Sequence, residues 1–193
     1  MNDTLPTVLE STTIFDNFFV VTKDRLRYPN QTVHDYFVLH TVKQSVAVIA
    51  TTPNNEIVVT KEYRHAAGRV LLGCPGGLVD EGEEPLEAAE RELLEETGFK
   101  AKRLTLIGSC FPLPGVLSQT LSIVHAEDVT YSRAPQLERQ ELIEWQLFSQ
   151  DELKHMLQQT TDVDAILCSS FFFYQLHVSQ ANSHASRSHL PSN

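Results

Sequence analysis

Cysteine is scarce in this sequence, and no two cysteines have the spacing of a metal-binding or redox pair. The three that are present, Cys74, Cys110 and Cys168, lie far apart in the chain. An odd number of widely separated cysteines is not typical of a disulfide framework. We therefore expect buried free thiols and a protein of the reducing cytoplasm.

Long apolar runs and an excess of basic residues are absent as well. No window approaches the roughly 20 apolar residues that cross a bilayer, and residues 1–6 lack the basic and apolar segments of a signal peptide. The 15 basic residues face 25 acidic ones, and the resulting formal net charge of −10 repels a phosphate backbone. We expect neither a membrane nor a nucleic acid as a main partner.

Histidine also lacks a metal-binding pattern. The eight histidines show neither a His-x-His nor a His-Glu-x-x-His spacing. We expect His184 and His189, near the end of the sequence, to be solvated rather than to bind metal. The aromatic run at 171–174 is interpreted as core or a dimer contact rather than as a platform for base stacking.

The 193 residues, 41% of them apolar, suffice for one globular core with a small extension. Short strand-like runs before residue 40 predict an N-terminal β-hairpin or meander, and residues 45–50 and 56–60 predict an antiparallel strand pair. The other expected elements are strands at 104–111, 121–126 and 142–148, a loop at 128–140, a helix at 150–158 capped by Ser149, and a last helix from Asp162 or Asp164 to His177. We divide the chain into a β extension at 1–40, a main domain at 41–181 and a disordered tail at 182–193.

One stretch, residues 77–99, carries most of the net negative charge. It holds nine acidic residues against the single base Arg91, a net of −8, so the remaining 16 acidic and 14 basic residues nearly cancel. Pro85 suits a first helical turn and Gly98 suits a C-terminal cap, which predicts a helix at 85–97. The side of this helix expected to pack carries Leu86, Ala89 and Leu93.

Three carboxylates lie together on an adjacent and, we expect, more exposed side of this helix: Glu92, Glu95 and Glu96. Positions i, i+3 and i+4 present oxygen ligands from consecutive turns, which suits Mg²⁺ or Mn²⁺ better than zinc. Glu83 is a fourth carboxylate that could bind metal or pair with Arg91. The alternative is a solvated acidic helix that binds no metal.

The order of residues in this stretch resembles the signature of the Nudix hydrolase family, which reads Gly, five residues, Glu, seven residues, then Arg-Glu-aliphatic-x-Glu-Glu-x-Gly and an apolar residue. The matching positions are Gly77, Glu83, Arg91, Glu92, Leu93, Glu95, Glu96, Gly98 and Phe99. The flanking segments 61–64, 74–77 and 113–115 resemble the ADP-ribose and nucleoside-diphosphate-sugar pyrophosphatase branch, which also carries an N-terminal β segment.

This resemblance implies an α/β fold, a Nudix-type α/β/α sandwich around a mixed β-sheet with an N-terminal β extension. It also implies roles for individual residues. Glu92 and Glu96 would be the principal metal ligands, Glu95 a further ligand or the base, and the Gly76 carbonyl a backbone ligand, while Glu83 and Arg91 would hold the loop to the helix. Three residues are assigned to substrate binding: Arg64, Tyr63 and Gln119. Arg64 would face phosphate, unless it is an ordinary surface arginine, and Tyr63 is a candidate to stack on a base.

Two positions depart from the pattern of that branch. Gln119 stands where relatives often place a glutamate that acts as the base, and Gly73 stands where they commonly place an acid. An amide accepts no proton at neutral pH, so the base would be Glu95 or Glu96, or else Glu138 or Glu141.

The sequence therefore predicts an enzyme, a Mg²⁺-dependent Nudix pyrophosphohydrolase that acts on an ADP-ribose-like nucleoside diphosphate sugar, with Mn²⁺ as a possible substitute. One alternative is a nucleoside triphosphate pyrophosphatase, which would release inorganic pyrophosphate. Another is a non-catalytic Nudix-fold sensor of nucleotide sugars, suggested by Gln119. The N-terminal β segment and the branch resemblance together predict a homodimer.

Overall fold

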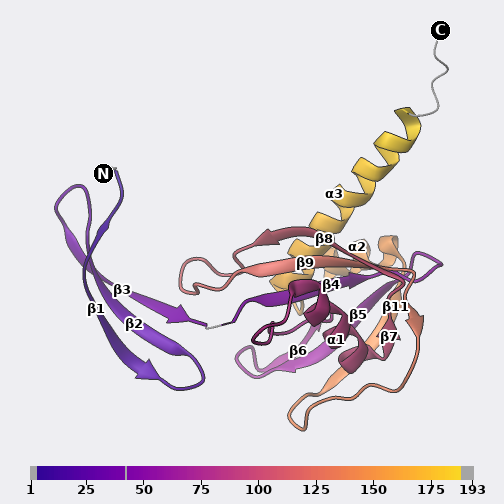
Figure 1. Cartoon of the computed structure of the whole chain (residues 1–193), viewed down its shortest axis with the longest axis horizontal. Helices are drawn as coiled ribbons and strands as arrows, with labels where there is room; N and C mark the ends of the chain where they lie inside the picture. The colour runs from indigo at the N-terminus through magenta and orange to yellow at the C-terminus, as the bar shows by residue number, and fades with distance from the viewer. Residues whose placement is uncertain (1–3, 42, 188–193) are drawn as a thin grey trace. The chain divides into compact units, whose positions relative to one another are not determined.

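The computed structural model describes residues 4–41 and 43–187 (Figure 1). The chain forms two compact units. The first consists of Met1–Gln44 together with Phe111–Thr120, and the second of Ser45–Cys110 together with Leu121–Asn193. The segment 111–120, which the sequence analysis placed in the main domain, thus belongs with the N-terminal residues.

The first unit is an antiparallel meander, as predicted. Its strands pair in the order β1-β2-β3 and span Thr7–Asp16, Val20–Arg27 and Val33–His40. The segment 111–120 is hydrogen-bonded to β3, since Leu39 N–H donates to the carbonyl of Val116 at 2.7 Å and Ser118 N–H donates to the carbonyl of Leu39 at 3.1 Å. The Tyr36 hydroxyl donates to the carbonyl of Gly115.

The second unit contains the remaining elements in chain order: β4 Ser45–Ala50, β5 Ile57–Arg64, β6 Arg69–Gly73, α1 Pro85–Thr97, β7 Phe99–Lys100, β8 Arg103–Cys110, β9 Leu121–Glu127, β10 Thr130–Tyr131, β11 Ile143–Phe148, α2 Gln150–Gln159 and α3 Ala165–Arg187. One sheet has the order β4-β9-β8 and is mixed, because β4 is parallel and β8 antiparallel to β9. A second sheet, β11-β5-β6, is antiparallel, and β10 pairs with β7.

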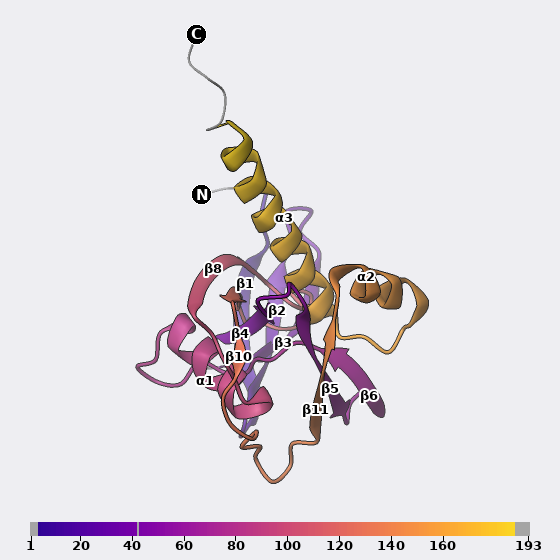
Figure 2. The same ribbon diagram turned by 90° about the vertical axis from the view of Figure 1, so that its right-hand side faces the viewer.

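Alternation along the buried strand β4 separates two apolar clusters on opposite faces of the strands. Val46 and Val48 face one way and pack with Leu93 of α1, whereas Ile49 faces the other way and packs with Leu167 of α3. Since residues that differ by one position point to opposite faces of a strand, the two helices lie on opposite sides (Figure 2). The second unit is therefore an α/β/α sandwich.

The predicted antiparallel pairing of residues 45–50 with 56–60 is wrong, because β4 and β5 belong to different sheets. One edge of β4 is taken by β9. On the other edge, Val46 N–H donates to the carbonyl of Gly77 at 2.9 Å and Val48 N–H to that of Pro75 at 2.8 Å. Only an isolated bridge between Thr51 and Ile57 joins the end of β4 to β5.

Three smaller expectations also differ from the structure. Leu86 is 38% exposed at the first turn of α1, and the buried face carries Ala88, Ala89 and Leu93. Helix α3 continues past His177 to Arg187, because no glycine or proline interrupts it, so residues 182–187 of the predicted disordered tail are helical. Residues 188–193, including His189, lie outside the described residues.

The cysteines are free, as expected. The expected burial is not met in full, because Cys74 and Cys110 are half-buried and Cys168 is exposed. In the described part of the chain, no helix is long and apolar enough to cross a membrane.

Candidate metal and catalytic site

The predicted helix at 85–97 is confirmed as α1, and its two ends explain why it begins and stops there. Glu84 N–H donates to the side chain of Glu87 at 2.9 Å, and Pro85 occupies the first turn, where its missing N–H costs nothing. Gly98 has a left-handed backbone with φ of 75° and donates its N–H to the carbonyl of Leu94 at 3.0 Å. The glutamates of the last turns are thereby held at a fixed place against the sheet.

Two glycines bring the loop before α1 into close contact with both β4 and the helix. A Cβ atom at Gly76 would lie 2.2 Å from the carbonyl oxygen of Val46, and one at Gly77 would lie 2.3 Å from Oε1 of Glu92. The backbone of β4 cannot yield to a Cβ atom at Gly76, so the loop can run here only because Gly76 has no side chain, whereas at Gly77 the end of the flexible Glu92 side chain would have to move. The backbone of Gly76 consequently lies next to the carboxylates of α1.

Arg91 ties this loop to the helix, which supports the bracing role expected for it and Glu83. Its Nε and Nη2 donate to the two oxygens of Glu83 at 2.9 and 3.0 Å, and Nη2 also donates to the carbonyl of Leu78 at 3.0 Å. Its Nη1 donates to Glu92 at 2.8 Å and to Glu95 at 3.3 Å. The guanidinium lowers the pKa of Glu83 and so keeps that carboxylate ionised.

Glu96 is the carboxylate that departs most from the expected exposed side of the helix. Its exposure is only 6%, and Gly76 N–H donates to its Oε2 at 3.1 Å. Burial is the main cause that raises its pKa to about 9, and the negative charge of Glu92 is the next. Among the ion pairs of the described residues, none gives Glu96 a basic partner. No basic side chain of the described residues therefore competes with a cation for this carboxylate.

The fold adds two acidic residues from outside the helix to this site. The charges of Glu62, on β5, and Glu141, just before β11, also raise the pKa of Glu96. Burial raises the pKa of Glu92 and of Glu62, and the charge of Glu141 adds to both shifts. We call the set Glu62, Glu92, Glu95, Glu96 and Glu141 the carboxylate cluster.

Glu62 has no assigned role in the sequence analysis, although it lies within the matching segment 61–64. The structure extends the strand predicted at 56–60 to Arg64, and alternation along this longer strand places Glu62 on the same face as Arg64. An assembly of oxygen donors with few basic partners is the donor set that divalent hard cations prefer. The residues present thus fit a divalent metal ion.

The residues assigned to substrate binding lie in different units. Arg64, at the end of β5, donates through Nη1 to Oε1 of Glu62 at 2.7 Å. Its Nη2 lies 3.8 Å from Oδ2 of Asp164, and its side chain is 46% exposed. Tyr63 and Glu141 help to line a pocket of about 510 Å³ between the ends of β5 and β11. Gln119 belongs to the first unit, where its amide donates to the carbonyl of Lys43 at 3.1 Å.

Comparisons with known proteins agree with this architecture. The model of the NUDIX domain matches residues 41–167. An ADP-ribose pyrophosphatase of Bacillus subtilis is 29% identical over 133 residues, which cover 68% of this chain and 72% of the relative. The ADP compounds hydrolase NudE of Escherichia coli is 30% identical over 125 residues, 64% of this chain and 67% of the relative.

A solved structure supports the fold directly. The crystal structure of an ADP compounds hydrolase superposes with a TM-score of 0.81 at 25% identity and covers 91% of this chain and 95% of its own. The predicted fold class and the resemblance in sequence are both confirmed, and so is the prediction of a pyrophosphohydrolase. This chain belongs to the Nudix hydrolase family.

Proposed function

We propose that this enzyme uses Mg²⁺ to hydrolyse the diphosphate linkage of an ADP-ribose-like nucleoside diphosphate sugar, with a nucleoside monophosphate and a sugar phosphate as products. The observation that carries the proposal is the carboxylate cluster beside the glycine loop, with Glu96 buried and without a basic partner among the described residues. The names of the relatives, ADP-ribose pyrophosphatase and ADP compounds hydrolase, support the class of substrate.

Glu92 and Glu96 would hold the metal, with Glu95 and the carbonyl of Gly76 as further ligands. Carboxylate oxygens favour Mg²⁺, and Mn²⁺ has similar enough demands to replace it. When bound, such an ion neutralises phosphate charge, polarises phosphorus and lowers the pKa of a coordinated water. Glu83 and Arg91 position the ligands, since Arg91 donates to both Glu92 and Glu95.

Among the candidates for the base, the electrostatics favour Glu141 over Glu138. The charge of Glu141 acts on Glu62, Glu92 and Glu96, so its carboxylate lies near the metal-binding groups. The charge of Glu138 is not among the causes of these three pKa shifts, and its backbone N–H donates to the carboxylate of Glu141 at 2.8 Å. We propose that Glu141 accepts the proton of the attacking water, a role for which Gln119 is chemically unsuited.

For the substrate itself, we propose that Arg64 binds phosphate and that Tyr63 contributes to the pocket that it shares with Glu141. Arg64 is held by Glu62 and Asp164 but remains about half exposed, so its guanidinium can exchange a carboxylate for a phosphate oxygen. A role for Gln119 in substrate binding stays a prediction.

The test is a panel of nucleotide substrates assayed with Mg²⁺, with the products identified. Release of AMP and ribose phosphate from ADP-ribose, in preference to nucleoside triphosphates, is the expected result. Release of inorganic pyrophosphate from triphosphates would overturn the proposal in favour of a triphosphate pyrophosphatase. Thermal stabilisation by a nucleotide sugar without turnover would overturn it in favour of a sensor.

We further propose a homodimer and a cytoplasmic location, the latter on the strength of the free cysteines. Light scattering at micromolar protein concentration is expected to give twice the mass of one chain, and a mass of one chain would contradict the dimer.

A further inference from the structure

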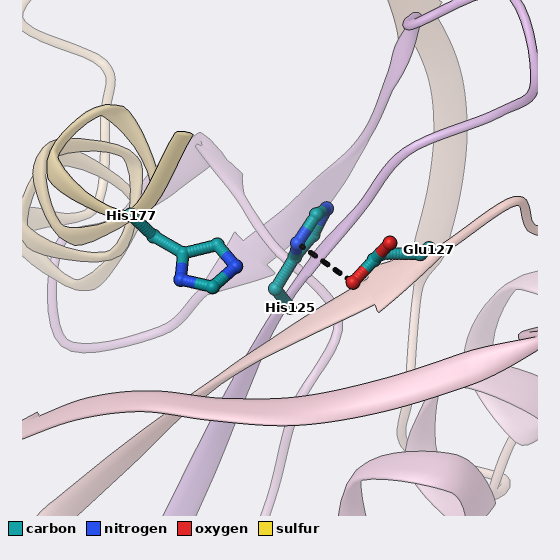
Figure 3. Close-up of side chains that lie close together, drawn as sticks. All are labelled: His125, Glu127 and His177. Atoms are coloured by element: carbon teal, nitrogen blue, oxygen red, sulfur yellow. Dashed lines mark ion pairs between the residues drawn. The ribbon is translucent and has the colours of Figure 1, made fainter. Parts of the chain in front are cut away.

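A second group of potential metal ligands lies away from the carboxylate cluster, on the α3 side of the sheet. Along β9, Val124 and Ala126 pack in the cluster beneath α1, so the intervening His125 and the following Glu127 point to the opposite face. Helix α3 covers that face, and Figure 3 shows the ring of His177 directed from the helix toward His125. One ligand atom from each of His125, Glu127 and His177 lies within 4.8 Å of the other two.

His125 is held in an orientation that leaves one nitrogen free. Its Nε2 lies 2.9 Å from the hydroxyl of Thr51, which also lies 3.4 Å from the carbonyl of Ala126. In the tautomer that carries its proton on Nε2, the ring donates to this hydroxyl and Nδ1 holds a lone pair. The ring is 5% exposed and packs edge-on against Tyr174, with ring centroids 4.9 Å apart. Its Nδ1 is buried and has no hydrogen-bond partner among the residues that the structure describes.

The groups nearest this nitrogen are a carboxylate and a second imidazole. Oε1 of Glu127 lies 3.8 Å from Nδ1, too far for a hydrogen bond. The other carboxylate oxygen, Oε2, accepts from Arg103, which fixes the carboxylate with Oε1 toward the ring. The ring of His177 lies with its centroid 5.6 Å from that of His125.

A buried nitrogen without a hydrogen-bond partner is rare in folded proteins, and a ligand from outside the chain would satisfy it. Two imidazoles and a carboxylate around one point are the donors of an open zinc site, in which water takes the fourth position. The contact between Thr51 and His125 and the hydrogen bond from Arg103 to Glu127 resemble the outer contacts that orient metal ligands.

We propose that Nδ1 of His125, Oε1 of Glu127 and a ring nitrogen of His177 bind one Zn²⁺ ion that joins β9 to α3. Ligand atoms around tetrahedral zinc are roughly 3.4 Å apart. The three atoms lie within 4.8 Å of one another, so they must close by up to roughly 1.4 Å. Rotation of the His177 side chain, which is only partly buried, supplies this movement. The site is distinct in its chemistry from the carboxylate cluster, because imidazole nitrogen favours Zn²⁺ over Mg²⁺.

The experiment is a Zn²⁺ titration of the full chain after all metal has been removed from it. Excess Mg²⁺ is present throughout to occupy the carboxylate cluster, and a chromophoric chelator competes for the Zn²⁺. One equivalent of Zn²⁺ is expected to bind, and to bind as well in the Glu92→Gln/Glu96→Gln double variant. His177→Gln and Glu127→Gln are each expected to weaken it at least tenfold. His155→Gln, which changes an exposed histidine on α2, serves as the matched control and is expected to bind like the wild type.

Thermal melting of the metal-free variants checks that each still folds, and X-ray absorption at the zinc edge counts the imidazole ligands. Two imidazoles in the wild type and one in His177→Gln are expected. Absence of bound Zn²⁺ in excess Mg²⁺, or a zinc affinity in His177→Gln equal to that of the wild type, would overturn the proposal. So would a loss of zinc in the Glu92→Gln/Glu96→Gln double variant, which would assign the ion to the carboxylate cluster.

Discussion

The carboxylate cluster and the histidine cluster of His125, Glu127 and His177 lie in the same unit but are built in opposite ways. The first takes three of its members from a single helix, within five residues. The second joins a strand to a helix some fifty residues later in the chain. The first offers only carboxylate oxygens in addition to backbone, whereas the second offers two imidazole rings and one carboxylate.

This difference decides what a sequence can reveal. A helix fixes the spacing of its own side chains, so ligands at i, i+3 and i+4 can be identified from the order of residues alone. No short-range rule relates His125 to His177, because their proximity depends on how α3 packs across β9. The absence of a His-x-His spacing therefore excluded only sites made within one element.

The largest effect that tests the carboxylate cluster is expected from Glu96→Gln. The amide keeps the shape of the side chain and removes the charge that the metal needs, so we expect kcat on the best substrate to fall on the order of a thousand-fold. Glu90→Gln, an exposed position on the same helix, is the control and is expected to retain full activity. Equal activity in the two variants would remove Glu96 from the metal site.

Most of the helix and its ends followed from Pro85, Gly98 and the carboxylate spacing, since these are local rules of helix formation. The burial of Glu96 was not predicted, because it depends on the loop at Gly76 folding over the end of the helix. The predicted pairing of β4 with β5 was wrong for a similar reason. The edge of β4 that such a hairpin would use is occupied by the loop before α1.

A substitution of Glu141 tests whether a residue outside α1 takes part in the reaction at the carboxylate cluster. If Glu141 accepts a proton in the reaction, Glu141→Gln lowers kcat about a hundred-fold with little change in KM, and it removes the acidic limb of the pH profile. Glu138→Gln, in the same loop, is the matched control and keeps the profile of the wild type. An unchanged acidic limb in Glu141→Gln would return the role of base to Glu95 or Glu96.

The pKa of Glu96 makes a separate prediction about the metal-free protein. Its ordinary value is 4.5 and the folded value is about 9, so between these limits the folded chain binds more protons than the unfolded chain. Glu96 therefore makes the free energy of unfolding decrease as pH rises through that window, by at most about 1.4 kcal/mol per pH unit. Denaturant unfolding in EDTA at several pH values measures the slope.

Glu96→Gln is expected to flatten this slope, leaving a smaller one from Glu62 and Glu92, whose pKa values are also raised by burial. Saturating Mg²⁺ is expected to flatten it in the wild type, because the cation compensates for the buried charge. The same slope in wild type and Glu96→Gln would show that this carboxylate is not desolvated in solution.

The smallest effect concerns the outer contact of the histidine cluster and sharpens its contrast with the carboxylate cluster. Thr51→Val removes the hydroxyl that lies 2.9 Å from Nε2 of His125 and keeps the shape of the side chain. Contacts of this kind orient a metal-binding imidazole, so Zn²⁺ affinity is expected to fall about tenfold. Mg²⁺-dependent hydrolysis is expected to stay within twofold of the wild type, because the carboxylate cluster lies on the α1 face. Chelator competition gives the Zn²⁺ affinity and the nucleotide assay gives the rate of hydrolysis, both on one preparation. An equal loss in affinity and in rate would mean that Thr51 acts through the stability of the sheet rather than through His125.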